Sequence, residues 1–347
     1  MIQVSPASTS WSTFVKEHSA GEFYYTPEWF ALIEKLYGYT IVPLTTTNAD
    51  GEITGFLPLC LVNSRITGKH VVGLPFSDQC PLLATDETSA QQLIDKAIAF
   101  AQQEKAHYLE LRTGSNDVLA ARTDLVAGNL YTRWQLPLPA SADTIWSGLR
   151  KPIQRQIKKA QNQGVQVRIA QDRKDIMQYY RLHLMTRSKH GMPAQSQRFF
   201  LELWDAFAAQ GKIQVLLAEY EGKVIAGMVL LLSDTTVRYA YGASDESYLH
   251  LGPNNLLMWT AIQMGCEQGY QTLDMGRTSS DNEGLMEFKR RWGAIKEELP
   301  YYYYPQMAGL ASTSETSLKF RLLTACWKKL PLPVAGLLGA LIYRHLG

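Results

Sequence analysis

The chain has 347 residues, more than the roughly 250 to 300 at which a single hydrophobic core stops growing, so we expect two domains. Hydrophobic residues make up 46% of the chain and charged residues 19%, which excludes a disordered protein. The net charge is only +2, but the positive charge is unevenly distributed. The dispersed cysteines fit neither a zinc motif nor a disulfide framework, which favours a reducing setting.

The sequence shows no sign of export or of a membrane span. Its first 14 residues have neither the basic nor the apolar region of a signal peptide, so we expect a cytoplasmic protein. No apolar run reaches the ~20 residues of a spanning helix, and the longest candidate, residues 330–343, contains two prolines.

The first half predicts a helix, a hairpin, a second helix and a short strand. Thr26 and Pro27 are typical of the start of a helix, and Gly38 is typical of its end. Two extended runs follow, separated by the turn residues Asn48 to Gly51. The later elements are predicted at residues 39–46, 52–62, 90–104 and 108–111.

The second half repeats this order. A helix over 199–210 precedes a strand over 213–220 and a turn at Glu221. Ala226-Gly227 on the returning strand corresponds to Thr54-Gly55, and Leu273-Asp274-Met275 corresponds to Leu109-Glu110-Leu111. Four elements recurring in order predict duplication of one α/β unit. We expect domains at residues 1–140 and 141–305, followed by a basic amphipathic tail at 306–347.

Residues 149–168 hold six cations and no acidic residue. Lys151, Arg155 and Lys158 recur on one face of the predicted helix, while Ile153 and Ile157 lie on the other. A cationic face suits a polyanion, and an ordinary solvated helix fits the pattern equally well.

Residues 273–293 join a short apolar strand to a cationic, aromatic helix through a polar loop. Leu285, Phe288 and Trp292 share one helical face, and Gly293 ends the helix. We expect the stem of Lys289 to lie along apolar surface while its ammonium reaches a cleft. The alternative is a surface helix with three solvated cations.

The stretch TRSKHG places Arg187, Lys189 and His190 at the end of a helix, where they suit a phosphate. Tyr241 lies on the strand over 236–242, where it either lines a cleft or belongs to the core.

No third ligand accompanies His183 and His190, so we expect no metal site. Motifs of common hydrolases, kinases, zincins and dinucleotide enzymes are missing, and we expect no bound cofactor and no DNA partner.

Residues 318–347 are basic, apolar and contain a tryptophan. This composition is typical of a peripheral anchor on an anionic bilayer surface. A tail helix packed on the protein body is the alternative.

Residues 145–305 contain the segments TRSKHGMP, YEGKVIAG, VRYAYGAS, LGPNNLLMW and LDMGRTSSDNEGLMEFKRRWGA, followed by YYYY. These segments resemble the Fem family of peptidyltransferases, and in particular the Fem-related proteins of exopolysaccharide gene neighbourhoods, which carry a GNAT-type acyltransferase domain. The most specific element, F-K-x-x-W-G, contains Phe288 and Lys289. The first half is similar more loosely, through GFLPL at 55–59 and LPFSD at 74–78.

The resemblance implies an α/β (α+β) fold of two tandem GNAT-like domains, each a mixed twisted sheet flanked by helices. It also implies acyl transfer to the amine of a diphosphate-bearing cell-envelope precursor. Lys289 would stabilise charge on the attacked carbonyl oxygen, which contributes ~3 to 4 kcal/mol in such sites. Asp274 or Asp281, or the substrate itself, would accept the proton. Residues assigned to substrate binding are Arg187, Lys189, His190, Tyr241, Asp78 and Arg277.

The resemblance implies that the acyl donor is an aminoacyl-tRNA. The glycine-rich loop with which GNAT enzymes hold acetyl-CoA is replaced here by SYLHLGPNNLL, although Asn254 and Asn255 could still bind an anion. The basic helix, through Lys151, Arg155 and Lys158, favours tRNA. Two alternatives are acyl-CoA-dependent transfer to an amino sugar and a non-catalytic scaffold in polysaccharide assembly.

Overall fold

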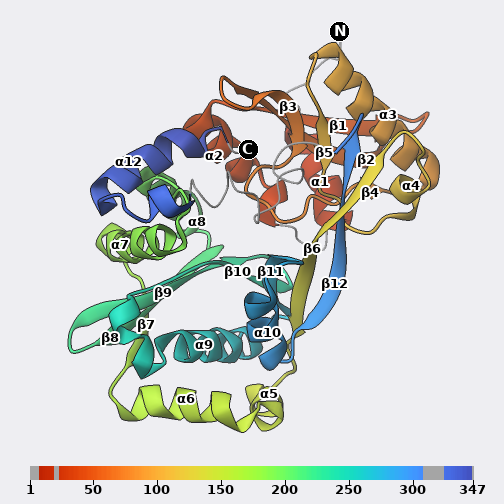
Figure 1. The fold of residues 1–347 in the computed structure, drawn as a ribbon. Coiled ribbons are helices and arrows are strands. Elements are labelled where there is room, and N and C mark those ends of the chain that lie inside the picture. Colours follow the sequence, from red (N-terminus) through yellow and green to blue (C-terminus); the bar gives the residue numbers. More distant parts are fainter. Residues whose placement is uncertain (1–7, 19–22, 308–323, 346–347) are drawn as a thin grey trace. The chain divides into compact units, whose positions relative to one another are not determined.

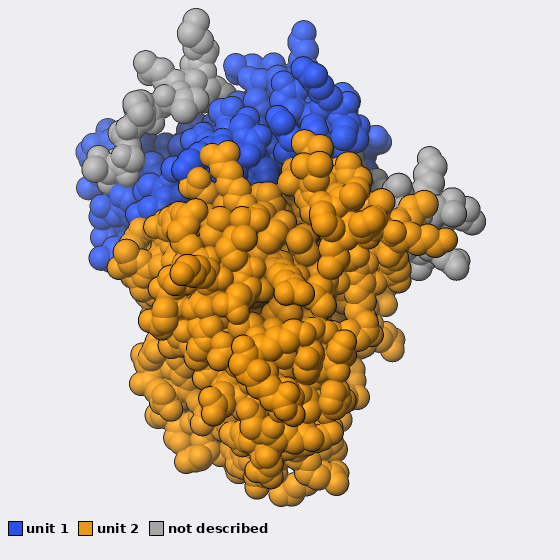
Figure 2. Space-filling model, turned by 90° about the vertical axis from the view of Figure 1, so that its left-hand side faces the viewer, with its two compact units in different colours: residues 1–132, 298–315, 344–347 blue, residues 133–297, 316–343 orange. Residues whose placement is uncertain are grey.

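The computed structural model describes residues 8–18, 23–307 and 324–345 (Figure 1). The chain forms two compact units, which are coloured separately in Figure 2. Each unit combines separate stretches of the chain, so the divisions predicted at residues 140 and 305 do not coincide with the unit ends. Unit 1 comprises Met1–Thr132, Glu298–Glu315 and Arg344–Gly347, and unit 2 comprises Arg133–Glu297 and Thr316–Tyr343.

Unit 1 contains a sheet with the strand order β1-β2-β3-β5-β12. The first three strands are antiparallel, β5 is parallel to β3, and β12 is antiparallel to β5. The predicted cap is confirmed, because the Thr26 hydroxyl accepts from Trp29 N and Gly38 has φ of 68°. The elements are α1 (Ser8–His18), η1 (Phe23–Tyr25), α2 (Pro27–Tyr37), β1 (Thr40–Thr47), β2 (Ile53–Ser64), β3 (Gly68–Gly73), β4 (Leu83–Ala84), α3 (Glu87–Gln103), β5 (Leu109–Leu111) and α4 (Asp117–Ala120). β6 (Val126–Pro137) and β12 (Ile295–Tyr304) pass from one unit to the other.

Unit 2 contains a sheet with the strand order β11-β10-β9-β8-β7. Helices α9 and then α6 cover one face of this sheet, and α7, α8 and α12 lie on the other side (Figure 1). The elements are α5 (Ala142–Gly148), α6 (Lys151–Asn162), β7 (Gln166–Ile169), α7 (Arg173–His190), α8 (Gln197–Phe207), β8 (Ile213–Tyr220), β9 (Lys223–Leu232), β10 (Thr236–Ser244), η2 (Glu246–Leu251), α9 (Pro253–Glu267), β11 (Thr272–Ser279), α10 (Glu283–Arg291) and α12 (Leu332–Tyr343).

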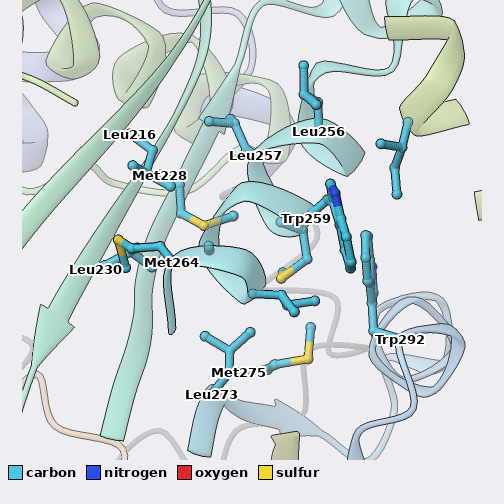
Figure 3. Close-up of a cluster of buried hydrophobic side chains, with 14 of the residues drawn as sticks. Leu216, Met228, Leu230, Leu256, Leu257, Trp259, Met264, Leu273, Met275 and Trp292 are labelled. Carbon is cyan, nitrogen blue, oxygen red and sulfur yellow. The ribbon is translucent and has the colours of Figure 1, made fainter. Parts of the chain in front are cut away.

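The core of unit 2 lies between α9 and the sheet (Figure 3). Leu257 and Met264 of α9 pack in one cluster with Met228 of β9 and Leu273 of β11. Trp292, at the end of α10, closes the same cluster. The strand that carries the candidate site is therefore anchored by apolar burial on this side.

The strand topology agrees with the repeat predicted from the sequence. In each unit three antiparallel strands are followed by a helix and then by a strand parallel to the third, β5 on β3 and β11 on β10. The corresponding glycines Gly55 and Gly227 both lie where a Cβ atom would be too close to a neighbour, 2.8 Å from Leu93 Cδ1 and 2.7 Å from Tyr179 Cδ2. The two units thus share a packing constraint as well as an order of elements.

The tail is described only in part, because residues 308–323 lie outside the described residues and include the start of the predicted 318–347 anchor. Helix α12 packs against α7, as the second of the two predicted alternatives requires. None of the helices in the described stretches combines the length and apolar character that crossing a bilayer demands.

Candidate functional site

A fully buried carboxylate, Asp274, lies in the middle of β11. Its Oδ2 accepts hydrogen bonds from Arg133 Nε at 3.0 Å and Nη2 at 2.7 Å. Arg238 Nη1 lies 3.2 Å from the same oxygen. The other oxygen, Oδ1, accepts from Gly276 N at 2.8 Å. One carboxylate therefore joins β6, β10 and the end of β11.

This environment determines the protonation state of Asp274. Burial alone would raise its pKa, but the charges of Arg238 and Arg133, with the hydrogen bonds, hold the pKa below its ordinary value. A carboxylate that stays ionised and is already paired is a poor proton acceptor. Asp274 is therefore poorly suited to act as the general base, and its contacts hold the strand in position.

Lys289 is the buried residue of α10, with 3% of its surface exposed. Its ammonium donates to Gly276 O at 2.8 Å and to Arg277 O at 3.1 Å. The alternative of three solvated cations is wrong for Lys289, whereas Arg290 and Arg291 are exposed and pair with Glu287. The ammonium thus lies at the end of β11 next to the residue that Asp274 also holds.

The helix around Lys289 follows the predicted pattern with one exception. α10 begins after Asn282, whose side chain accepts from Leu285 N, and Gly293 follows its end with φ of 85°. Trp292 is buried, whereas Leu285, which was predicted to share its helical face, is exposed. The position lies in the first turn, where the adjoining chain does not cover it.

Helix α7 ends in the predicted group of cations. Gly191 ends the helix in the left-handed region, with φ of 66°, and Arg187 Nε donates to Pro193 O at 2.9 Å. Lys189 is exposed and pairs with Glu246 at 2.8 Å. Desolvation lowers the pKa of His190, and the charges of Lys189 and Arg187 lower it further. The imidazole is therefore neutral at physiological pH and adds a donor without adding charge.

The charges of Arg187 and Arg277 both act on Tyr343 of α12. Burial raises the pKa of the Tyr343 hydroxyl, and the charges of both arginines lower it. Arg277 belongs to β11, and its carbonyl oxygen is the one that Lys289 contacts. Three of the predicted site residues, from α7, β11 and α10, therefore belong to one region of unit 2.

A group of aromatic and polar side chains lies near Arg187. Tyr241 is half-buried and meets the rings of His183 and Phe200 edge to face, at centroid distances of 6.3 and 5.4 Å. His183 is buried and its Nε2 lies 2.9 Å from Gln195 Oε1, while burial lowers its pKa to about 3. Within the described part of the chain, His183 Nδ1 and the Tyr179 hydroxyl are buried without a hydrogen-bond partner.

Orphaned buried donors of this kind are uncommon and suggest a ligand. No sequence motif marks them as binding residues, although Tyr179 and His183 lie at i, i+4 on α7 and could have indicated a shared face. The burial of Asp274 could also have been predicted, because this carboxylate lies between Leu273 and Met275 in an apolar strand.

The residues predicted to bind the acyl donor lie on α6 and at the start of α9. Lys151, Arg155 and Lys158 are exposed on α6, opposite the buried Ile153 and Ile157, as the helical pattern predicted. Beside α6, Gly252 begins α9 with φ of 76° and without a side-chain cap. A Cβ atom on Gly252 would lie 3.1 Å from Gln156 O of α6. Asn254 is exposed in the first turn of α9 and Asn255 is half-buried.

Asp78 belongs to unit 1, whereas the other predicted substrate-binding residues belong to unit 2. The loop at 74–78 is held by Arg112, whose Nη1 donates to Leu74 O and Ser77 O at 3.3 Å each. Arg112 is buried and pairs with Glu110 at 2.6 Å. Phe76 in this loop has φ of 64°, a conformation that a non-glycine residue rarely adopts.

Comparison with known proteins agrees with this architecture. Residues 147–290 match the acetyltransferase (GNAT) domain family. The chain is also similar to a lipid II:glycine glycyltransferase of Staphylococcus epidermidis, with 32% identity over 87 residues that cover 23% of this chain and 21% of that relative. Residues 147–290 thus resemble a GNAT domain, and a shorter part of the chain resembles a Fem-type glycyltransferase.

Solved structures extend the likeness in fold to most of the chain. The crystal structure of FemX has a TM-score of 0.70 at 17% identity, and the alignment covers 88% of this chain and 97% of FemX. A tandem GNAT protein from the clavulanic acid biosynthesis pathway has a TM-score of 0.50 at 12% identity, covering 78% of this chain and 84% of that one. The predicted fold class of tandem GNAT-like domains is thereby confirmed.

Replacing Asp274 with Asn should destabilise unit 2 strongly. The change keeps the shape of the side chain but leaves Arg133 and Arg238 without their carboxylate, which we expect to lower the free energy of unfolding by about 3 to 5 kcal/mol. Urea denaturation measures this loss. Glu287→Gln, which affects exposed ion pairs only, serves as the control and should cost at most about 1 kcal/mol.

The effect of Asp274→Asn should also depend on pH. The folded-state pKa of Asp274 is lowered, so its contribution is present above the unfolded-state pKa of about 3.9 and is lost as pH falls through the folded-state pKa. The difference in stability between wild type and variant should therefore be smaller at pH 3 than at pH 7. Equal differences at both pH values would contradict the assignment.

Proposed function

We propose that this protein transfers an aminoacyl or acyl group to an amine of a cell-envelope or exopolysaccharide precursor that bears a diphosphate. The observation that carries the proposal is the convergence of Arg187, Arg277 and the buried Lys289 at the end of β11. The GNAT-domain match covers all three residues. The lipid II specificity in the name of the staphylococcal relative also fits, because lipid II carries a diphosphate.

Arg187 and Arg277 are suited to the acceptor diphosphate. A guanidinium binds phosphate oxygens with two parallel N–H donors, and these two residues come from different elements, so they can hold two phosphate groups at once. Lys189 and His190 extend the cationic end of α7 toward solvent. The partnerless Tyr179 hydroxyl and His183 Nδ1 supply hydrogen bonds to a polar part of the substrate.

Lys289 is suited to the transition state. When the amine attacks the carbonyl carbon of the donor, a C–N bond forms and the carbonyl oxygen becomes negative. Collapse of this intermediate breaks the bond to the leaving oxygen or sulfur, which takes up the proton that the amine loses. A buried ammonium stabilises that oxygen better than a solvated one, because little water screens it. Asp274 does not take the amine proton, but it holds Gly276, the peptide that Lys289 contacts.

Two donors suit different parts of unit 2. The exposed cations of α6 fit the phosphate backbone of an aminoacyl-tRNA. The first turn of α9 fits the phosphates of an acyl-CoA, because Gly252 supplies no capping side chain and helix N-termini bind anions. The larger cationic surface makes aminoacyl-tRNA the leading candidate, and acyl-CoA with an amino-sugar acceptor is the second.

The proposed role of Lys289 predicts a large loss of rate in Lys289→Met. The variant keeps the length of the side chain but removes the charge, so we expect kcat to fall about 100- to 1000-fold. Arg290→Met, one residue away and exposed, should stay within about twofold of wild type, since solvent screens its charge. Circular dichroism and thermal unfolding must show that Lys289→Met is folded. A folded variant with wild-type kcat would contradict the role.

The proposed acceptor site predicts weaker acceptor binding in Arg187→Gln and in Arg277→Gln. Each change removes one charge-assisted contact, for which we expect KM to rise about tenfold or more, with a smaller change in kcat. Arg181→Gln, at an exposed position of the same α7 helix, is the matched control. If an acceptor that lacks the diphosphate is affected to the same degree, these arginines do not bind phosphate.

The donor is tested by measuring the binding of charged tRNA and of acyl-CoA side by side, at low and moderate salt. Contacts to phosphates weaken steeply with salt, so we expect tight tRNA binding that falls by at least about tenfold between 50 and 200 mM salt. The triple variant Lys151→Glu, Arg155→Glu, Lys158→Glu should lose it. Acyl-CoA binding that is indifferent to the triple change would favour the second candidate, and binding of neither donor would favour a scaffold.

A further inference from the structure

Helix α12 has two apolar faces, and the residues that the structure describes cover only one of them. The small residues Ala335, Gly336 and Gly339 are buried. On the other face, Val334, Leu337, Leu338 and Leu341 are exposed, the largest fractions being 66% for Leu337 and 54% for Leu341. These positions are spaced i, i+3, i+4 and i+7, so they form one continuous apolar stripe along the helix. Exposed apolar patches of this kind mark interaction surfaces.

The covered face fixes the direction of the exposed one. A Cβ atom on Gly339 would lie 2.7 Å from Ala194 O, and one on Gly336 would lie 3.3 Å from Leu184 Cδ2 of α7. Only residues without a side chain permit such a close approach, so α12 packs on unit 2 with its glycines inward. The leucines therefore face away from unit 2, and rotating the helix to turn them inward would make them clash with it.

The charges of the segment that contains this stripe have one sign. Lys328 and Lys329 are exposed just before α12, and Arg344 is exposed just after it. Residues 324–345 contain no Asp or Glu. An apolar stripe with cations at both ends matches the boundary between the acyl chains and the headgroups of an anionic bilayer. A second copy of this chain fits less well, because pairing two such faces would bring their cations together.

We propose that the outer face of α12 is a docking surface for an anionic phospholipid bilayer. The helix of 12 residues is too short to span, and it would lie in the plane of the interface with Val334, Leu337, Leu338 and Leu341 among the acyl chains. Lys328, Lys329 and Arg344 would contact phosphate headgroups. The glycine face would stay on α7, so docking requires no unfolding of unit 2.

Docking would also determine where the candidate site lies. α12 carries Tyr343, which adjoins Arg187 and Arg277, so the bilayer would lie close to the proposed acceptor phosphates. This consequence rests on the proposed function and fits an acceptor with a lipid-linked diphosphate. The docking itself does not depend on catalysis and is tested without substrate.

The test is co-flotation of the full chain with vesicles of phosphatidylcholine alone and of phosphatidylcholine with 25 mol% phosphatidylglycerol. We expect binding to the anionic vesicles that weakens with salt. Leu337→Ser with Leu341→Ser should reduce the partition coefficient at least about tenfold, since two large apolar side chains no longer enter the membrane. Lys328→Gln with Lys329→Gln should reduce it about fivefold per charge, on anionic vesicles only.

The matched control is Ile169→Ser, which removes an exposed apolar residue from β7 of the same unit and should leave binding unchanged. All variants have exposed positions, so thermal unfolding should show the wild-type transition. Wild-type binding by the Leu337→Ser, Leu341→Ser variant, or no binding by wild type, would overturn the proposal. So would sedimentation showing a dimer that this variant abolishes, because a second copy would then cover the face.

Discussion

The pairing of Asp274 with Arg133 and Arg238 is the interaction on which the candidate site depends. A carboxylate with no exposed surface is tolerated only when cations and hydrogen bonds compensate its lost hydration, and here two arginines and the Gly276 amide do so. The pairing fixes the last residues of β11, and Lys289 then binds the carbonyl oxygens of that same segment. The ammonium of Lys289 can be buried here because the carbonyl oxygens that it binds are already held in place.

Local signals predicted the elements of the fold well. The ends of α2 could be predicted from Thr26, Pro27 and Gly38, because helix capping depends on residues that are close in sequence. The duplication was accessible for a related reason, since hydrophobic period and turn residues recur in the same order in both halves. What these signals could not give was the division of the chain, because β6 and β12 each belong partly to both units and pairing between distant strands leaves no local trace.

The sequence offered candidate site residues but gave no information on their contacts. The motif identified Lys289 and Arg187, yet the expectation that the lysine ammonium extends to a cleft missed its bonds to Gly276 O and Arg277 O, which depend on how α10 folds back onto β11. The partners of Asp274 come from strands 36 and 141 residues away. Likewise, the glycines of α12 read as helix-weakening residues in sequence, and only packing on α7 explains why they are there.

The two units hold a buried carboxylate at corresponding positions of their parallel strands in different ways. Leu109-Glu110-Leu111-Arg112 in β5 corresponds to Leu273-Asp274-Met275-Gly276 in β11, and in both the carboxylate is buried and paired with arginine. In unit 1 the arginine is Arg112 itself, which also binds two carbonyl oxygens of the 74–78 loop. In unit 2 a glycine takes that position, the arginines come from β6 and β10, and Lys289 binds the backbone oxygens instead. Both units thus place one buried cation on backbone carbonyls beside the parallel strand. Because the cation of unit 2 arrives from a separate helix, that helix can carry catalytic chemistry without disturbing the carboxylate that holds the strand.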